Sequence, residues 1–173
     1  TWQQQNNITL TSGLTNDGIW YSGQQQIVNN VASWVNYEDS IKNIITLATL
    51  TGNGTFNVNN GDLEINQSGI STFDGDITGQ GSFTKSGTGT LKISDAQTFT
   101  GGLNVTGGIF ETLVGGTLAD TVAIHVSKDS TFIAGAADTV GSVLVDAKGT
   151  GTTAGLFTLN ANITTQGDYT NNG

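Results

Sequence analysis

Residues 73–112 read FDGDITGQGSFTKSGTGTLKISDAQTFTGGLNVTGGIFET, and this stretch decides the fold. Its apolar residues come in pairs separated by one polar residue, as in Leu91·Ile93 and Leu103·Val105, and glycines lie between the pairs. Alternation with a period of two predicts short strands that bury one face. Because glycine permits tight bends at little steric cost, the stretch predicts strands of roughly three to five residues joined by sharp turns.

The same alternation continues on both sides of this stretch. Further pairs of apolar residues two positions apart are Phe56·Val58, Leu63·Ile65, Ile124·Val126, Val143·Val145 and Phe157·Leu159. Strands this short favour a solenoid, in which each turn of chain stacks on the one before, over a sandwich or a barrel. We therefore predict that residues 51–173 are all-β and form a parallel β-helix with the inward residues Phe56, Val58, Leu63, Ile65, Leu91, Ile93, Leu103, Val105, Ile124 and Val126.

The spacing of the phenylalanines agrees with a repeat. Phe56 and Phe83, Phe73 and Phe99, and Phe83 and Phe110 are separated by 27, 26 and 27 positions. At roughly 20–25 residues per turn, residues 51–173 would make five or six turns.

Composition excludes several classes of function. The 173 residues include 5 Lys and no Arg against 14 Asp and Glu, and the net charge is −9. Nucleic acids and anionic membranes both require clustered cations, so neither is an expected partner. The chain has no Cys and one His, which excludes disulfide scaffolds, thiol nucleophiles and Cys- or multi-His metal sites. We expect no cofactor and no metal.

The chain begins at Thr1 without a signal-like segment, and no apolar run approaches the ~20 residues that cross a bilayer. We therefore expect an excised fragment of a longer protein that does not itself insert into a membrane.

The motifs of residues 73–112 follow one another in a recognisable order. Its parts are Gly75-Asp76-Ile77-x-Gly79-x-Gly81, then Phe83-Thr84-Lys85-x-Gly87-x-Gly89-Thr90-Leu91, then Thr98-Phe99-Thr100-Gly101-Gly102, and then Val105-x-Gly107-Gly108. This string resembles the passenger-associated repeat of bacterial autotransporters and related surface adhesins. Phe83 and Phe99 stand where that family more often has Leu and Tyr, which bears on packing.

The resemblance implies a right-handed parallel β-helix exported by type V secretion. It also implies an extracellular location on the bacterial cell surface, anchored through or released from the outer membrane. The absence of Cys suits a chain threaded unfolded through a pore, and the absence of Pro suits strands in which every N–H is needed.

Residues 1–50 form an atypical N-terminal segment, distinct from the β-helix predicted for residues 51–173. All three Trp and two of the three Tyr lie in it, whereas all seven Phe lie after residue 55. One interpretation is an end turn or cap plugged by aromatic rings. The other is a surface that contacts a host-cell or neighbouring-cell protein or glycan through Trp20, Tyr21, Trp34 or Tyr37.

The secondary structure of this segment has two interpretations. Apolar residues from Val31 to Ile45 recur near helical spacing. Strands at residues 8–10, 18–21 and 44–47 fit the sequence equally well.

Residues that could carry catalysis are few. His125 lies between two apolar residues predicted to point inward, so it is expected on the outer surface. Asp62 and Glu64 share the outer face of one predicted strand, and Asp74 and Asp76 lie in a predicted turn. Either acidic pair could serve as a glycosidase acid/base pair or bind calcium. We interpret both as solubilising surface charge, and we assign no catalytic residue.

Three classes of function follow. The preferred one is a non-catalytic, surface-displayed segment that acts in adhesion or as a structural rod. The second is a carbohydrate-active β-helix of the lyase or pectinase type, against which the absence of Arg argues. The third is an ice-binding solenoid, which needs stacked Thr-x-Thr pairs; the candidate pairs Thr9·Thr11, Thr88·Thr90 and Thr98·Thr100 do not share one spacing.

Overall fold

The chain is an all-β solenoid of about five turns, with no helix in the part that the structure describes. The computed structural model describes residues 2–4, 8–10, 14–15, 19–22, 24–28, 31–35, 43–58 and 61–173, with side chains for residues 46–58 and 61–173.

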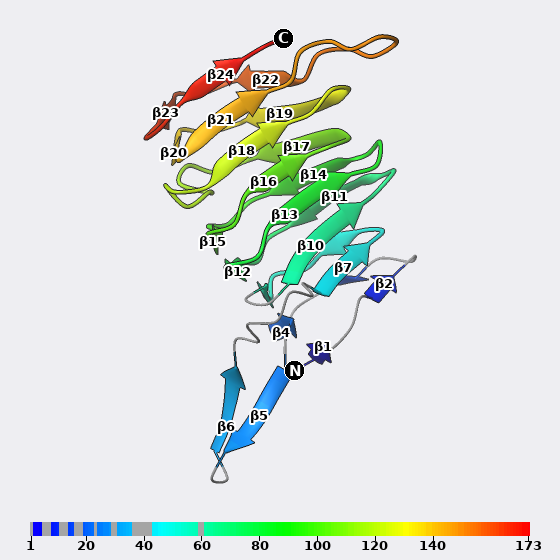
Figure 1. Ribbon diagram of the computed structural model, residues 1–173, viewed down its shortest axis with the longest axis vertical. Helices are drawn as coiled ribbons and strands as arrows, with labels where there is room; N and C mark the ends of the chain where they lie inside the picture. The colour runs from blue at the N-terminus through cyan, green and yellow to red at the C-terminus, as the bar shows by residue number, and fades with distance from the viewer. Residues whose placement is uncertain are drawn as a thin grey trace.

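Three stacks of parallel strands run along the molecule, and the chain visits them in the same order in successive turns (Figure 1). Sheet 1 contains β1 (Trp2–Gln4), β4 (Ile19–Ser22), β9 (Thr55–Asn57), β12 (Ile77–Gly79) and β15 (Thr98–Phe99). Sheet 2 contains β2 (Ile8–Leu10), β7 (Asn43–Leu47), β10 (Gly61–Asn66), β13 (Phe83–Ser86), β16 (Leu103–Val105), β18 (Ala123–Val126), β21 (Ser142–Val145) and β24 (Tyr169–Asn171). Sheet 3 contains β11 (Ile70–Phe73), β14 (Thr90–Ile93), β17 (Gly108–Thr112), β19 (Ser130–Ala134) and β22 (Leu156–Leu159).

Three further pairs complete the described strands. Two are parallel: β3 (Leu14–Thr15) with β8 (Leu50–Thr51), and β20 (Asp138–Val140) with β23 (Ile163–Thr165). The third is an antiparallel hairpin of β5 (Gln24–Val28) and β6 (Val31–Val35), which lies at the N-terminal end of the stack in Figure 1.

Between β10 and β16 one turn of the solenoid takes 20 residues, whereas the last turn is longer, since Phe132 pairs with Phe157 and Val143 with Tyr169. Leu63 pairs with Phe83, and Phe83 pairs with Leu103. The separations of 26 and 27 positions between phenylalanines are therefore not the structural period. Phe83 instead meets Phe99 and Phe110 edge to face across the interior, with ring centroids 6.0 and 5.8 Å apart.

The predicted interior is confirmed. All ten residues expected to point inward are 0–1% exposed: Phe56, Val58, Leu63, Ile65, Leu91, Ile93, Leu103, Val105, Ile124 and Val126. They belong to one continuous core cluster that runs from turn to turn. Since each strand has only two or three inward positions, this core comes from stacking and not from any single turn.

Glycines stack at the corner between sheet 1 and sheet 2. A Cβ added to Gly81 would lie 1.8 Å from the carbonyl oxygen of Gly61, and one added to Gly101 would lie 2.2 Å from that of Gly81. The backbones of successive turns touch at this corner, so only a hydrogen atom fits as side chain. The 20-residue spacing of these glycines equals the length of the middle turns, from β10 to β16.

Before residue 51, β1 and β4 join sheet 1, and β2 and β7 join sheet 2. Strands occupy Ile8–Leu10, Ile19–Ser22 and Asn43–Leu47, so the strand interpretation is confirmed. The helical interpretation is wrong for Val31–Val35 and Asn43–Leu47, because both are strands. Val and Ile are β-branched and favour extended backbone, and β7 gains a ladder with β10 that a helix would forfeit.

Candidate functional site

The aromatic residues proposed to contact a ligand lie in the first turns. Trp20 and Tyr21 are in β4, where they pair with Phe56 and Asn57 of β9. Trp34 is in β6 of the hairpin. The structure does not describe these three side chains, and Tyr37 lies outside the described residues, so their role stays a prediction.

The acidic pair Asp62 and Glu64 lies on the outer face of sheet 2, on either side of buried Leu63, as predicted. Each carboxylate bonds to another turn. The Asp62 Oδ1 accepts the backbone N–H of Ser82 at 2.8 Å, and Glu64 accepts the hydroxyl of Ser86 at 2.5 Å. These contacts tie β10 to the next turn, which is a structural use of the carboxylates.

The second acidic pair lies where sheet 3 passes into sheet 1. Asp74 accepts the hydroxyl of Ser94 one turn further on. Partial burial raises the pKa of Asp76 above its ordinary value, and the nearby charge of Asp95 adds to the effect. Among the described residues, no three His, Asp or Glu side chains gather in a way that would hold a metal ion.

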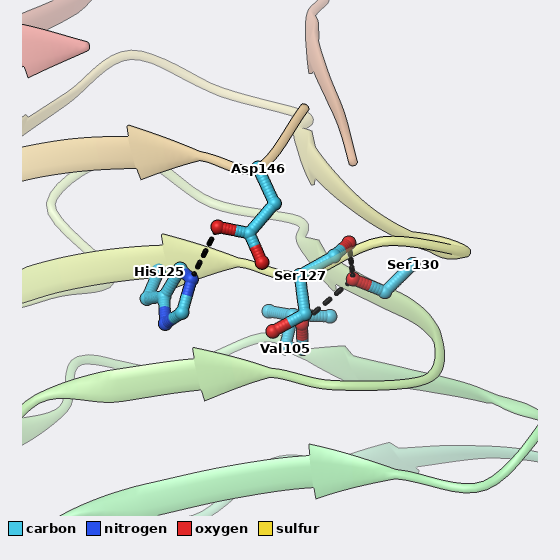
Figure 2. A network of polar contacts seen from close by, with 5 residues as sticks. All are labelled: Val105, His125, Ser127, Ser130 and Asp146. Carbon is cyan, nitrogen blue, oxygen red and sulfur yellow. Dashed lines mark hydrogen bonds and ion pairs between the residues drawn. The ribbon is translucent and has the colours of Figure 1, made fainter. Parts of the chain in front are cut away.

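His125 lies on the outer face of sheet 2 as predicted, and it has a partner that the sequence did not indicate. Its Nε2 lies 3.0 Å from Oδ1 of Asp146, and both side chains are partly exposed (Figure 2). The nearby Ser130 hydroxyl faces the backbone carbonyls of Val105 and Ser127 at 2.6 Å each, not the imidazole. The His–Asp pair therefore joins neighbouring turns, and no hydroxyl group of a residue that the structure describes is bonded to the imidazole.

Lys85 is a buried polar residue that the sequence pattern did not single out. It is 0% exposed and points into the solenoid together with Phe83. Its Nζ donates to the carbonyls of Ser86, Gly87 and Gly107 at 2.5, 3.4 and 3.1 Å. Burial lowers its pKa to about 8. Because the amine is enclosed, its role is to hold the corner between sheet 2 and sheet 3. Its position two residues after Phe83 in the same strand was the sequence signal that it points inward.

Other corners are held by buried polar side chains in the same way. Gln97 accepts the N–H of Ile77 at 2.7 Å and donates to the carbonyls of Gly75 and Asp95, each at 2.9 Å. Asp138 accepts the N–H of Leu118 at 2.9 Å, and burial raises its pKa. Corner backbone that no strand pairs is thereby satisfied from inside.

The outer face of sheet 3 differs from the sites described above because it carries aliphatic side chains at outward positions. Its outward positions carry four aliphatic residues, four threonines and one ion pair: Ile70, Thr72, Thr90, Lys92, Ile109, Glu111, Thr131, Ile133, Leu156 and Thr158. We call this surface the Ile/Thr face. Its aliphatic side chains reach 76% exposure at Ile70 and 54% at Leu156. Ile70 and Leu156 lie on the first and last strands of the sheet, and threonines separate the aliphatic residues along their column.

No protein-family model, curated protein or solved structure matches this chain. In the described part of the chain, no helix has the length and apolar character needed to cross a bilayer.

Proposed function

We propose that this chain is a non-catalytic, rod-forming segment of a secreted bacterial surface protein of the autotransporter passenger class, with an adhesive role. One observation carries the proposal. The stretch that resembles the passenger-associated repeat runs from β11 to β17, and its glycines and large side chains each occupy a position that the solenoid fold requires. Gly81 and Gly101 occupy a corner where only glycine fits, while Phe83 and Lys85 fill the interior.

A rod suits display at a distance from the cell. Each turn adds about 4.8 Å, the spacing between neighbouring strands, so length is gained by repeating one unit. A chain without Cys can be exported unfolded and then fold outside the cell. An extracellular location at the outer membrane follows from this proposal.

The non-catalytic part of the proposal rests on how the polar residues are used. Asp62, Glu64 and His125 bond to neighbouring turns. A carbohydrate-active β-helix typically needs cations beside its acids. Lys85 is enclosed and Lys92 is paired with Glu111 at 2.9 Å, so neither of these two lysines serves such a site, and Lys128 has the exposed Asp129 beside it.

The ice-binding alternative requires Thr-x-Thr pairs that stack on one face, and the candidate pairs do not meet this requirement. Thr90 belongs to sheet 3 and Thr98 to sheet 1, so the threonine pairs that contain them do not stack on one face. On the Ile/Thr face, Thr90 and Thr131 alternate with Ile70, Ile109 and Leu156 along one column, so they form no unbroken ladder of threonines.

For adhesion, we propose a host-cell or neighbouring-cell protein or glycan as partner and residues 1–50 as the contact region, through Trp20, Tyr21, Trp34 or Tyr37. Such rings combine a flat apolar surface with a polar group, and they concentrate in this segment.

Surface display tests the proposal. We would fuse the chain to a signal peptide and an outer-membrane translocator, and measure protease-accessible display and binding to cultured cells. We expect display of the wild type and loss of binding for Tyr21→Ala with Trp34→Ala, with Thr84→Ala on sheet 2 as the matched control. Retention inside the cell would contradict the export proposal, and depolymerisation of a polysaccharide panel by the purified chain would contradict the non-catalytic one.

A further inference from the structure

The connection from sheet 2 to sheet 3 is much longer in the last described turn than in the turns before it. Residues 146–155 join β21 to β22, whereas residues 87–89, 106–107 and 127–129 make the same connection in earlier turns. Figure 1 shows the longer connection as an orange loop that projects from the corner. We call it the 146–155 loop. Two or three residues are enough to turn this corner, so the solenoid fold does not require the additional residues.

The backbone of this loop is held at its base and at one tight turn. At the base, the Gly155 N–H donates to the carbonyl of Asp146 at 3.0 Å. In the turn, the Gly149 N–H donates to the hydroxyl of Thr152 at 2.9 Å, and the Thr152 N–H donates to the Gly149 carbonyl at 3.3 Å. The structure describes residues 147–152, and they belong to no strand and to no part of the core cluster. Opening this short segment therefore costs much less free energy than unfolding a turn.

The tip of the loop combines exposure with small side chains. Ala147, Lys148, Thr150 and Gly151 are exposed, and a Cβ added to Gly151 would meet nothing within 4 Å. Proteolytic nicking concentrates at exposed loop tips of this composition, because the backbone can adapt to a cleft and few side chains obstruct it. The loop tip is therefore accessible to a protease while the strands around it stay paired.

The positions of the lysines decide which class of protease fits. A protease with a carboxylate in its specificity pocket binds Lys or Arg before the bond it cuts, and this chain has no Arg. Lys85 is enclosed, and Lys92 lies in β14 and is paired with Glu111. Lys128 is exposed, but it lies in the short connection between β18 and β19. Of the lysines that the structure describes, Lys148 alone combines exposure with a long connection.

We propose that the bond between Lys148 and Gly149 is a cleavage site for a protease of trypsin specificity, and that the solenoid stays folded when this bond is cut. In the hydrolysis, the bond between the Lys148 carbonyl carbon and the Gly149 nitrogen breaks. The hydroxyl group of a water molecule joins the carbonyl carbon, and the nitrogen takes up the proton to become a new amino terminus. The site is a property of the folded chain and is independent of the function proposed above.

The last turn has contacts that hold it in place after the cut. β22 pairs with β19, β23 with β20 and β24 with β21, and all three partner strands precede the cut. The Phe157 ring stacks on that of Phe132, with centroids 4.8 Å apart. The Asp129 carboxylate also accepts the N–H of Thr153 at 2.6 Å. Residues after the cut are therefore expected to remain bound to those before it.

Limited digestion of the whole folded chain with trypsin tests the proposal. Every protein carries Lys42→Gln, so that cleavage is compared among the lysines that the structure describes. Mass spectrometry of a time course measures the cut after each lysine. We expect the bond after Lys148 to be cut first, at least about tenfold faster than the bond after Lys128, because cleavage follows the population of the opened segment. Similar rates after the two lysines, or a first cut elsewhere, overturn the proposal.

Three variants separate the loop from other causes of cleavage. Lys148→Gln is expected to remove the first cut, and addition of Thr150→Lys to that variant is expected to restore a cut in the loop tip. Thr84→Lys places an additional lysine at an outward position of β13 and is expected to stay uncut. If the double variant resists digestion, or if Thr84→Lys is cut as fast as the loop, the proposal fails.

Circular dichroism and size-exclusion chromatography follow the nicked chain. We expect an unchanged β signal and one peak that contains both fragments, which separate only in denaturant. Loss of the β signal, or release of residues 149–173 in native buffer, overturns the proposal that the solenoid stays folded.

Discussion

The middle turns and the last described turn share one sequence pattern, yet they differ in burial. Leu91 of β14 and Leu159 of β22 are both inward positions of sheet 3, since they pair with buried Phe110 and buried Ala134. Leu91 is 0% exposed and Leu159 is 55% exposed. A described turn covers β14 on each side, whereas β22 is the last strand of its sheet. In a solenoid, neighbouring turns decide what a side chain contributes.

The largest expected effect on stability comes from placing an aspartate at each of these two leucines. Leu91→Asp places a carboxylate in an enclosed apolar core, and we expect a loss of several kcal/mol in the free energy of unfolding, on the order of 4 or more. Leu159→Asp meets solvent and is expected to cost less than about 1 kcal/mol. Urea denaturation of both variants measures the difference, and similar losses would contradict the assignment of the interior.

The next effect concerns the corners of the middle turns. Gly81→Ala places a methyl group where the Gly61 carbonyl oxygen lies 1.8 Å away, so backbone must move. We expect a loss of about 2–4 kcal/mol, at the upper end of overpacking costs. Gly69→Ala is the matched control, since nothing lies within 4 Å of its added Cβ. Equal melting temperatures for the two variants would show that the turns can separate at this corner.

Lys85 gives the middle turns a distinctive dependence on pH. Its pKa falls from an ordinary 10.5 to about 8 on folding. Below pH 8 both folded and unfolded chains hold the proton; between about pH 8 and 10.5 only the unfolded chain does. Stability therefore rises with pH across this window, by about 3 kcal/mol for this group.

The Lys85→Met variant isolates this contribution, because it keeps an unbranched side chain and removes the titrating amine. Denaturation of both proteins from pH 7 to 10.5 should show a rise in the wild type that the variant lacks. Parallel curves would mean that the amine reaches water in the folded chain.

The smallest expected effect is on the outer surface. His125→Ala removes a partly exposed contact with Asp146, and such surface pairs contribute about 0–1 kcal/mol. We expect a change within about 0.5 kcal/mol at pH 7 by urea denaturation. A loss approaching that of Leu91→Asp would place the His–Asp pair among the contacts that hold the turns together.

Several features of the candidate sites followed from local pattern. Alternation put Leu63 inside and Asp62 and Glu64 outside, because neighbouring residues of a strand point to opposite faces. The same parity applied to Lys85 would have placed it inside, but its charge favoured the surface. Only the corner carbonyls of the folded chain reveal why the amine is tolerated there.

Contacts between turns could not be predicted from local alternation in the sequence. His125 and Asp146 are 21 residues apart, and they meet because one turn has nearly that length. The phenylalanine spacing suggested a longer period, whereas the glycines at 61, 81 and 101 carried the correct one. These glycines mark the length of a turn because the backbones of successive turns touch at their corner, which fixes their position in each turn. Phenylalanine rings can fill the interior from any of the three sheets, so their spacing need not equal the length of a turn.

The sequence by itself determined that the chain is all-β, which residues of each short strand point inward, and that turns stack as a solenoid. These properties depend on alternation and on glycine, and both act within a few residues. Tertiary structure alone decided the register of the turns, the carbonyls that the buried Lys85 amine meets, and the gathering of Ile70, Ile109, Ile133 and Leu156 on one face. Those properties depend on which residues stack one turn apart, and that is set by the length of each turn.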